Sequence, residues 1–387
     1  MLSNAQKVQE KSIHVNTLCE GIHHQRPTLL NAVLNEIVLC HQNQWLDQNL
    51  GPRYQRDRMM ASFSCPECLG RIFIRKGRRY RLYKSVIGTS LIPILQVQCR
   101  SCGRRFCPYK QAIGLAFAER ISPALKQRQV ELTCQFSYRK ARNFIKSCLD
   151  IRTSTSTIRK EIDRKAAQIR QRPVSAFGEV VYDDSTKVKA GSKERGTSIH
   201  LAITAKPGKS NGKRHTMIKR LMFLKTGDGE QIKKSLKELN AKGIVHDGDM
   251  DLSGCAPLLQ RCLWHLVHQL KHFLWLDNVA LKDREPYVKE LIEILFHSST
   301  VKEMTTNYRT FFEKLFNNGL SQSFVHLSNA ENELTTSREN HFPYHTTSPV
   351  EREMREINRR SDIGVRWSIP GIENLLLVKT DLALNGP

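Results

Sequence analysis

Apolar residues in the first hundred positions follow two different periods. After Pro27 they recur every three or four residues, which predicts an amphipathic helix that begins at this proline. Residues 71–84 and 91–97 alternate instead, which predicts two β-strands. We therefore expect a helical segment over 1–60 and a small β-domain over 61–108. The apolar side of the helix would carry Leu30, Val33, Leu34, Ile37 and Val38.

Three short helices are predicted next, over about 122–134, 137–149 and 154–170. Ser122, Ser137 and either Ser154 or Ser156 stand where helix N-caps are expected. Three helices with short links favour a helix-turn-helix over 120–172, whose third helix could enter the major groove of DNA. That helix would turn Ile158 and Ile162 inward, although packing alone is the alternative. Its basic residues, the candidate DNA contacts, include Arg159, Lys160 and Arg164.

From Val174 the pattern alternates again and a new domain over 174–387 is expected. Strands are predicted over 177–189, 197–205 and 215–224, followed by a helix over 228–239 and a buried strand over 244–246. This order fits a ribonuclease-H-like (RNase-H-like) sheet, in which the fourth strand lies parallel beside the first. Asp184 and Asp247 would then converge at one edge. Helices are predicted over 258–276 and about 286–316. The predicted fold class is therefore mixed α+β.

The charge of the chain indicates a polyanionic partner. Lys and Arg total 61 against 37 Asp and Glu, a formal charge of +24. An excess of this size favours nucleic acid over an ordinary metabolic substrate. No apolar run reaches the roughly 18 to 20 residues of a membrane helix, and residues 1–11 lack the apolar segment of a signal peptide. We expect a cytoplasmic, nucleoid-associated protein with no membrane partner.

Four of the 11 cysteines form two C-x-x-C pairs, Cys65 with Cys68 and Cys99 with Cys102. A reducing cytosol argues against disulfides. Two such pairs supply the four sulfur ligands of a closed structural Zn²⁺ site. The basic, alternating segment between them is typical of a zinc ribbon. Cys107 is either a spare thiol or an alternative ligand.

Two converging aspartates in a strongly basic protein suggest divalent cations that act on phosphate. Mg²⁺ prefers oxygen ligands, and two ions roughly 4 Å apart can activate an attacking oxygen and stabilise the leaving one. Glu351 is the candidate third carboxylate. It could equally belong to a capping box with Ser348, in which it would bind a backbone N–H. Asp183 competes with Asp184 because neighbours on a strand face opposite sides.

Several short motifs follow one another in a recognisable order. This order resembles that of DDE transposases of prokaryotic insertion sequences, in particular the Mutator-like superfamily with its C/D-x-x-H motif. The resemblance covers about residues 180–380, behind the zinc ribbon and the helix-turn-helix, and Pro349 stands where relatives often carry Asn. The motifs are Asp184-Ser185-Thr186-Lys187, Asp247-Gly248, Cys262-Leu263-Trp264-His265, Ser348-Pro349-Val350-Glu351 and Gly364-Val365-Arg366-Trp367-Ser368.

The resemblance implies an enzyme, a DDE transposase that cuts insertion-sequence ends and transfers the strands with Mg²⁺ or Mn²⁺. Asp184, Asp247 and Glu351 would be the catalytic, metal-binding triad, and Cys262 and His265 would support the active site. A helical insertion over about 286–340 would precede Glu351. The partners would be double-stranded DNA, both terminal inverted repeats and target, and further copies of the chain in a homodimer or larger assembly.

Other interpretations stay open at this stage. Arg355 and Arg359 on the last predicted helix could bind the DNA backbone or simply face solvent. A second zinc site on the helix with Cys262, His265, His268 and His272 is less favoured, because no acidic pair completes it. The chain could also be a regulator that binds DNA but has lost catalysis, or a structure-specific nuclease.

Overall fold

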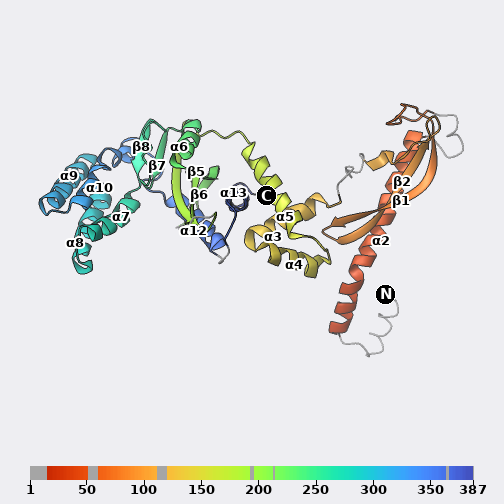
Figure 1. The fold of residues 1–387 in the computed structure, drawn as a ribbon, viewed down its shortest axis with the longest axis horizontal. Coiled ribbons are helices and arrows are strands. Elements are labelled where there is room, and N and C mark those ends of the chain that lie inside the picture. The colour runs from red at the N-terminus through yellow and green to blue at the C-terminus, as the bar shows by residue number, and fades with distance from the viewer. Residues whose placement is uncertain are drawn as a thin grey trace. The chain divides into compact units, whose positions relative to one another are not determined.

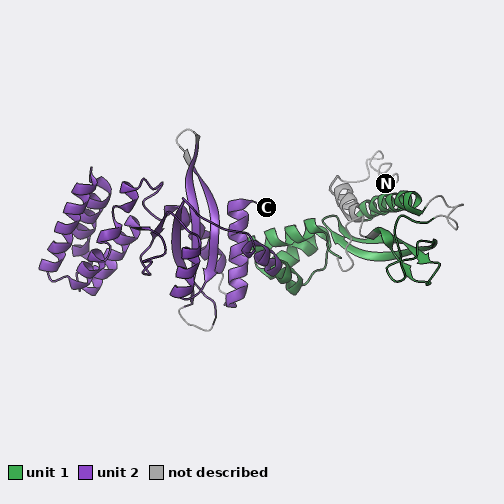
Figure 2. Ribbon diagram, turned by 90° about the horizontal axis from the view of Figure 1, so that it is seen from above, with its two compact units in different colours: residues 1–161 green, residues 162–387 purple. Residues whose placement is uncertain are grey.

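The structure, a computed structural model, describes residues 15–50, 60–110, 120–191, 196–211, 214–362 and 366–386. It is a mixed α/β protein with two sheets. The chain divides into two compact units, residues 1–161 and 162–387 (Figure 2). The division falls inside helix α5 (Thr155–Arg170), ahead of the domain boundary expected at residue 174. The end of α5 belongs to unit 2 because Arg170 forms a 2.7 Å ion pair with Glu373.

The first described element of unit 1 is a long helix, α2 (Val15–Leu50), packed on an antiparallel three-stranded sheet (Figure 1). The strands, in spatial order, are β1 (Phe73–Ser85), β2 (Gly88–Cys99) and β3 (Arg105–Phe106), and η1 (Pro108–Lys110) follows. The two predicted strands are therefore confirmed. Gln42 anchors the helix, because its amide donates to the Pro93 carbonyl at 2.7 Å and accepts from the Leu95 N–H at 2.9 Å.

The prediction that the first helix begins at Pro27 is wrong. Helix α2 begins at Val15 and passes through residue 27. Proline removes one backbone hydrogen bond, but the other bonds of a 36-residue helix continue on both sides. The expected apolar side is also only partly covered, since Val33 and Ile37 are each 51% exposed. The narrow sheet covers one stripe of the helix, where Leu34 and Val38 pack.

The next three helices are those predicted: α3 (Pro123–Gln135), α4 (Tyr138–Leu149) and α5. Ser122, Ser137 and Ser154 each accept a hydrogen bond from the backbone N–H three residues further on, as N-cap residues do. Ser154, not Ser156, therefore caps α5. Ile158 and Ile162 are fully buried, as expected. DNA binding by these helices stays a prediction.

Unit 2 contains a five-stranded sheet of order β6-β5-β4-β7-β8. Strands β6, β5 and β4 are antiparallel, whereas β4, β7 and β8 are parallel. The three hairpin strands and the parallel placement of the fourth strand beside the first are thus confirmed. The strands are β4 (Val180–Val188), β5 (Thr197–Asn211), β6 (Arg214–Thr226), β7 (Gly243–His246) and β8 (Leu258–Arg261).

Helices cover both faces of this sheet. The predicted helix α6 (Gly229–Glu238) packs Ile232 and Leu236 against Val181 and Ile244 on one face. Helix α12 (Ser348–Ser361) lies along β4 on the other, where Thr186 donates a hydrogen bond to Asn358. Helix α13 (Ile369–Asn385), which the apolar pattern did not predict, contacts β6. In the last motif, Gly364 and Val365 lie outside the described residues.

Between β8 and α12 the chain is helical and has its own core. The helices are α7 (Leu263–Leu276), α8 (Leu281–Ile292), α9 (Val301–Asn317), α10 (Ser321–Ser328) and α11 (Thr336–Glu339). The core includes Leu266, Leu270, Tyr308 and Phe311. The helix predicted over 258–276 is wrong in its first four residues, which pair with β7 as strand β8. A short apolar run is compatible with either a helix or a strand. Here the run pairs with the open edge of β7, so it forms a strand. Within the described part of the chain, every helix is too short or too polar to span a membrane.

Candidate metal centre and carboxylate site

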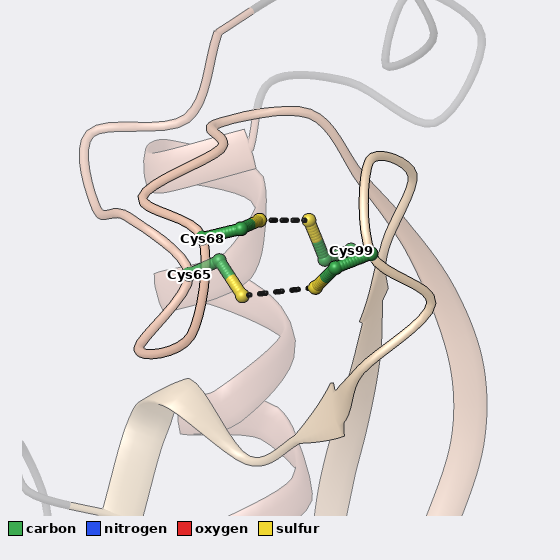
Figure 3. Close-up of side chains that lie close together, drawn as sticks. Cys65, Cys68 and Cys99 are labelled. Carbon is green, nitrogen blue, oxygen red and sulfur yellow. Dashed lines mark hydrogen bonds between the residues drawn. The ribbon is translucent and has the colours of Figure 1, made fainter.

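Two loops of unit 1 bring the four cysteines of the C-x-x-C pairs together (Figure 3). The Cys65 and Cys102 sulfurs lie 3.6 Å apart, the Cys68 and Cys99 sulfurs 3.5 Å apart, and all four lie within 4.8 Å of one another. Cys65 and Cys99 are buried, whereas Cys68 and Cys102 are exposed. This set can hold a metal ion and is compatible with structural zinc. Cys107 is not part of it.

The backbone of both knuckles is arranged to support thiolates. The backbone N–H of Cys102 has the largest effect on Cys99 and, against the effect of burial, helps to lower its pKa to about 6. The Gly70 N–H has the largest single effect on Cys68 and lowers its pKa, but the side chains of Cys102 and Cys99, together with burial, raise that pKa to about 12. Four adjacent thiols cannot all ionise without a cation. A bound metal ion would remove this conflict.

In unit 2, Asp184 and Asp247 stand on adjacent parallel strands. In the β4–β7 pairing, Tyr182 lies opposite Val245. Asp184 and Asp247 each come two residues later in their chain segments, so they share one face and one edge of the sheet. Asp184 is 6% and Asp247 8% exposed. Burial raises the pKa of Asp184 to about 7, and the Asp247 charge adds to this effect while His265 opposes it. The pair therefore concentrates negative charge in a nearly buried position.

Asp183 belongs to the opposite face of β4. One of its carboxylate oxygens lies 3.7 Å from His200 Nδ1, and the other is buried without a hydrogen-bond partner. Burial raises the pKa of Asp183. Because α12 covers the face that carries Asp184, the arrangement favours Asp184 over Asp183 as the residue that faces the candidate third carboxylate. The assignment of a metal ligand stays a prediction.

Cys262 and His265 link this acidic pair to the start of α12. Thr347, which directly precedes α12, places its hydroxyl 3.3 Å from Cys262 Sγ and 3.2 Å from His265 Nδ1. Burial has the largest effect on His265 and opposes protonation, but Cys262, Asp184 and Asp247 together raise the pKa of His265 to about 9. These effects favour the protonated form of His265, which contacts Thr347 ahead of α12. A second zinc site of Cys262, His265, His268 and His272 does not form among the described residues.

Glu351 lies on the first turn of α12. It is seven residues, or two helical turns, before Asn358 and so lies on the same side of the helix. Within the described residues its carboxylate has no hydrogen bond or ion pair. The capping-box interpretation is wrong, because the helix already includes Ser348, whose N–H approaches Thr346 Oγ1 at 3.4 Å. Nearby Glu353 instead forms a 3.0 Å ion pair with Lys219 on β6.

The carboxylates of Asp184, Asp247 and Glu351 do not lie close enough together to share a metal ion as they stand. Apart from the four cysteines, no group of three His, Cys, Asp or Glu in the described part of the chain has its ligand atoms within 4.8 Å of one another. Asp184, Asp247 and Glu351 therefore do not form a closed cluster.

A group that the sequence did not reveal fixes the loop after β7. Arg261 on β8 lies over Gly248, so that a Cβ at this glycine would be 1.4 Å from the guanidinium. Glu333 holds Arg261 at 3.2 Å and also lies 3.2 Å from His246 Nε2. Nothing in the spacing of these residues signals the contact, because the strand that carries Arg261 was predicted as helix.

The candidate DNA contacts are all on the surface. Arg159, Lys160 and Arg164 project from α5 and are exposed, and so are Arg355 and Arg359 on α12. Arg359 also forms a 2.6 Å ion pair with Glu356. Exposure is necessary for phosphate contacts, although it does not distinguish them from solvated charges.

Neither a protein-family model nor a curated protein matches this chain.

Proposed function

We propose that unit 2 is an RNase-H-like catalytic domain and that the chain is a DDE-type DNA transposase of an insertion sequence. The strand order, three antiparallel strands followed by two parallel ones, supports this fold. One observation carries the proposal: parallel pairing sets Asp184 beside Asp247, and α12 is fixed along the same face of β4 with Glu351 on its first turn.

The residues present fit a hard divalent cation. Asp184 and Asp247 supply oxygen ligands, their close approach leaves excess negative charge, and the Glu351 carboxylate is not engaged by a neighbour among the described residues. When bound there, Mg²⁺ or Mn²⁺ would neutralise charge on the reacting phosphate and activate the attacking oxygen. We assign Asp184, Asp247 and Glu351 as its ligands.

The other residues would position these ligands and the DNA. Thr347, Cys262 and His265 would fix the start of α12 relative to Asp184. The exposed arginines of α5 and α12 would bind the phosphate backbone, and the zinc ribbon and the three helices of unit 1 would recognise the element ends. Water would cut a phosphodiester bond and free a 3′ hydroxyl. This hydroxyl would then attack a phosphodiester of target DNA, form the new bond to its phosphorus and release a 3′ hydroxyl of the target strand. A homodimer or larger assembly would hold two ends.

The test is cleavage and strand transfer on a plasmid that carries the DNA flanking this gene, with Mg²⁺ or Mn²⁺. Asp184→Ala, Asp247→Ala and Glu351→Ala should each abolish the chemistry and leave DNA binding intact. Glu353→Ala is the matched control, because this neighbouring glutamate is paired with Lys219. Cleavage without joining would indicate a nuclease, and binding without cleavage would indicate a regulator.

A further inference from the structure

One face of α7 carries four aromatic side chains that the proposed chemistry does not use. Trp264, His268, His272 and Trp275 follow one another at spacings of four, four and three residues, so they form one stripe along the helix. We call them the ring stripe. It lies away from the buried side of α7, which includes Leu266, Leu270 and Leu274. Trp264 is 40% and Trp275 55% exposed, and both histidines are exposed.

The rings of the stripe lie in two pairs of similar tilt. Trp264 and His268 have centroids 6.2 Å apart and His272 and Trp275 5.4 Å apart, with 34° between the ring planes in each pair. Flat rings exposed at such separations give planar ligands surfaces on which to stack.

A pocket of about 570 Å³ lies beside the middle of the stripe. His268 and His272 form one side of it, Gly248 and Asp249 of the loop after β7 another, and His326 on α10 a third. Asp249 is two residues from Asp247, and its N–H donates to the Asp247 carboxylate at 3.0 Å. The pocket is therefore next to the proposed catalytic carboxylates.

The pocket offers hydrogen-bond acceptors beside a donor, Gln269, whose amide donates to the Asp249 carboxylate at 3.3 Å. Asp249 offers a carboxylate, and His326 Nε2 is buried without a hydrogen-bond partner. Burial lowers the pKa of His326 to about 4, so its ring is neutral. The second carboxylate oxygen of Asp249 and the His326 ring nitrogen can accept hydrogen bonds from the amino groups of bases. The pocket chemistry thus suits the edge of a base, and the rings suit its faces.

We propose that the ring stripe and this pocket bind unpaired nucleotides of the DNA strand beside the Asp247 loop. Bases would stack on the exposed rings, and one base edge would enter the pocket. This inference rests on the proposed function, because the DNA on which the proposed enzyme acts supplies the strand. The net charge of +24 draws DNA to the chain, and stacking tolerates any base because every base has a flat face.

The test uses a labelled oligothymidylate of about twelve nucleotides, with a chelator present and at raised salt, where purely electrostatic binding weakens. Trp264→Ala and Trp275→Ala should each weaken binding about tenfold, and a duplex of equal length should bind nearly as before. Phe177→Ala is the control, because Phe177 is 78% exposed in the same unit but lies outside the stripe. In the wild type, tryptophan fluorescence should be quenched on binding, and Trp275→Phe should reduce this quenching, because Trp264 remains in the stripe, but should keep most of the affinity.

Three results would overturn the proposal. The first is that a variant carrying both Trp264→Ala and Trp275→Ala binds the oligonucleotide as tightly as the wild type. The second is that this variant loses duplex binding to the same extent. The third is that the variants change the oligomeric state, which would make the stripe a protein interface. The ring of Trp264 also packs on that of Phe296, with centroids 4.7 Å apart. If Trp264→Ala lowers the melting temperature for this reason, the result with Trp275→Ala decides. Asp184→Ala should keep oligonucleotide binding while it abolishes cleavage, which separates this proposal from the proposed function.

Discussion

Thr186 on β4 donates a 2.9 Å hydrogen bond to the side-chain oxygen of Asn358 on α12, although the two residues are 172 positions apart. Both side chains are half-buried. Asp184 lies two residues before Thr186 on the same face of β4, and Glu351 lies two helical turns before Asn358 on the same side of α12. In the proposed site, the register that this hydrogen bond supports would present Glu351 to the aspartates.

Asn358→Ala should loosen that register. We expect the free energy of unfolding to fall by about 1 kcal/mol, the usual net value of one hydrogen bond, and cleavage to fall by more than this loss of stability explains. Urea unfolding and divalent-dependent cleavage would measure the two effects. Thr186→Val should have the same effect, and the double variant should lose little more than either single one. Fully additive losses would show that the two side chains are not coupled.

Gly248→Ala should disturb the loop that carries Asp247. The residue has φ of +91°, and its added Cβ would overlap the Arg261 guanidinium. The displaced Arg261 would leave Glu333, so we expect a loss of roughly 2 to 3 kcal/mol in stability and strongly reduced cleavage. Urea unfolding gives the first quantity.

Gly254→Ala separates backbone strain from the overlap. Gly254 has φ of +77°, but no atom lies within 4 Å of the position that an added methyl group would take. This variant should cost only about 1 kcal/mol, the strain alone, and keep full cleavage. Equal effects of the two variants would contradict the role of Arg261.

Local signals in the sequence predicted much of the fold. The serines before α3, α4 and α5 each form the cap that their position suggests, and the alternation over β4, β5 and β6 marks the hairpin strands. The C-x-x-C pairs predicted the cysteine cluster because the ligands lie in two short turns. In all these cases the decisive contacts are close in the chain or follow a strong period.

The errors arise where distant contacts decide. Residues 258–261 carry an apolar pattern that suits a helix, yet the open edge of β7 takes them as a strand. Glu351 could cap its own helix, and only the start of α12 at Ser348 excludes this. The Arg261–Gly248 contact and the Thr186–Asn358 bond join segments whose approach depends on the whole sheet, so no local pattern reveals them.

The cysteine cluster should bind one zinc ion per chain. Purified wild type should contain about one equivalent of zinc, and Cys65→Ser and Cys99→Ser should lose it and unfold unit 1, because these two buried thiols also lie in its core. Elemental analysis and circular dichroism would measure both effects. Cys107→Ser is the control, since Cys107 is outside the cluster. Zinc loss in this variant would instead make Cys107 a ligand.

The last prediction concerns the buried charge of Asp184. Burial, with a smaller contribution from the Asp247 charge, raises the pKa of Asp184 from its ordinary value of 3.8 to about 7. The folded chain thus binds this proton more tightly than the unfolded chain. The stability that Asp184 contributes is fully present below about pH 4 and is lost as the pH rises to about 7.

Asp184→Asn, which is neutral at every pH, should remove this dependence. In a chelator we expect the variant to gain stability relative to the wild type between about pH 5 and about pH 8, by on the order of 2 kcal/mol, since one pKa unit corresponds to about 1.4 kcal/mol. Urea unfolding at both pH values measures the difference. Asp251→Asn is the control, because hydrogen bonds from Ser253 lower the pKa of that exposed carboxyl and so predict no such gain. If Asp184→Asn and the wild type change in parallel, Asp184 does not carry the buried charge, and its place beside Asp247 would have to be reconsidered.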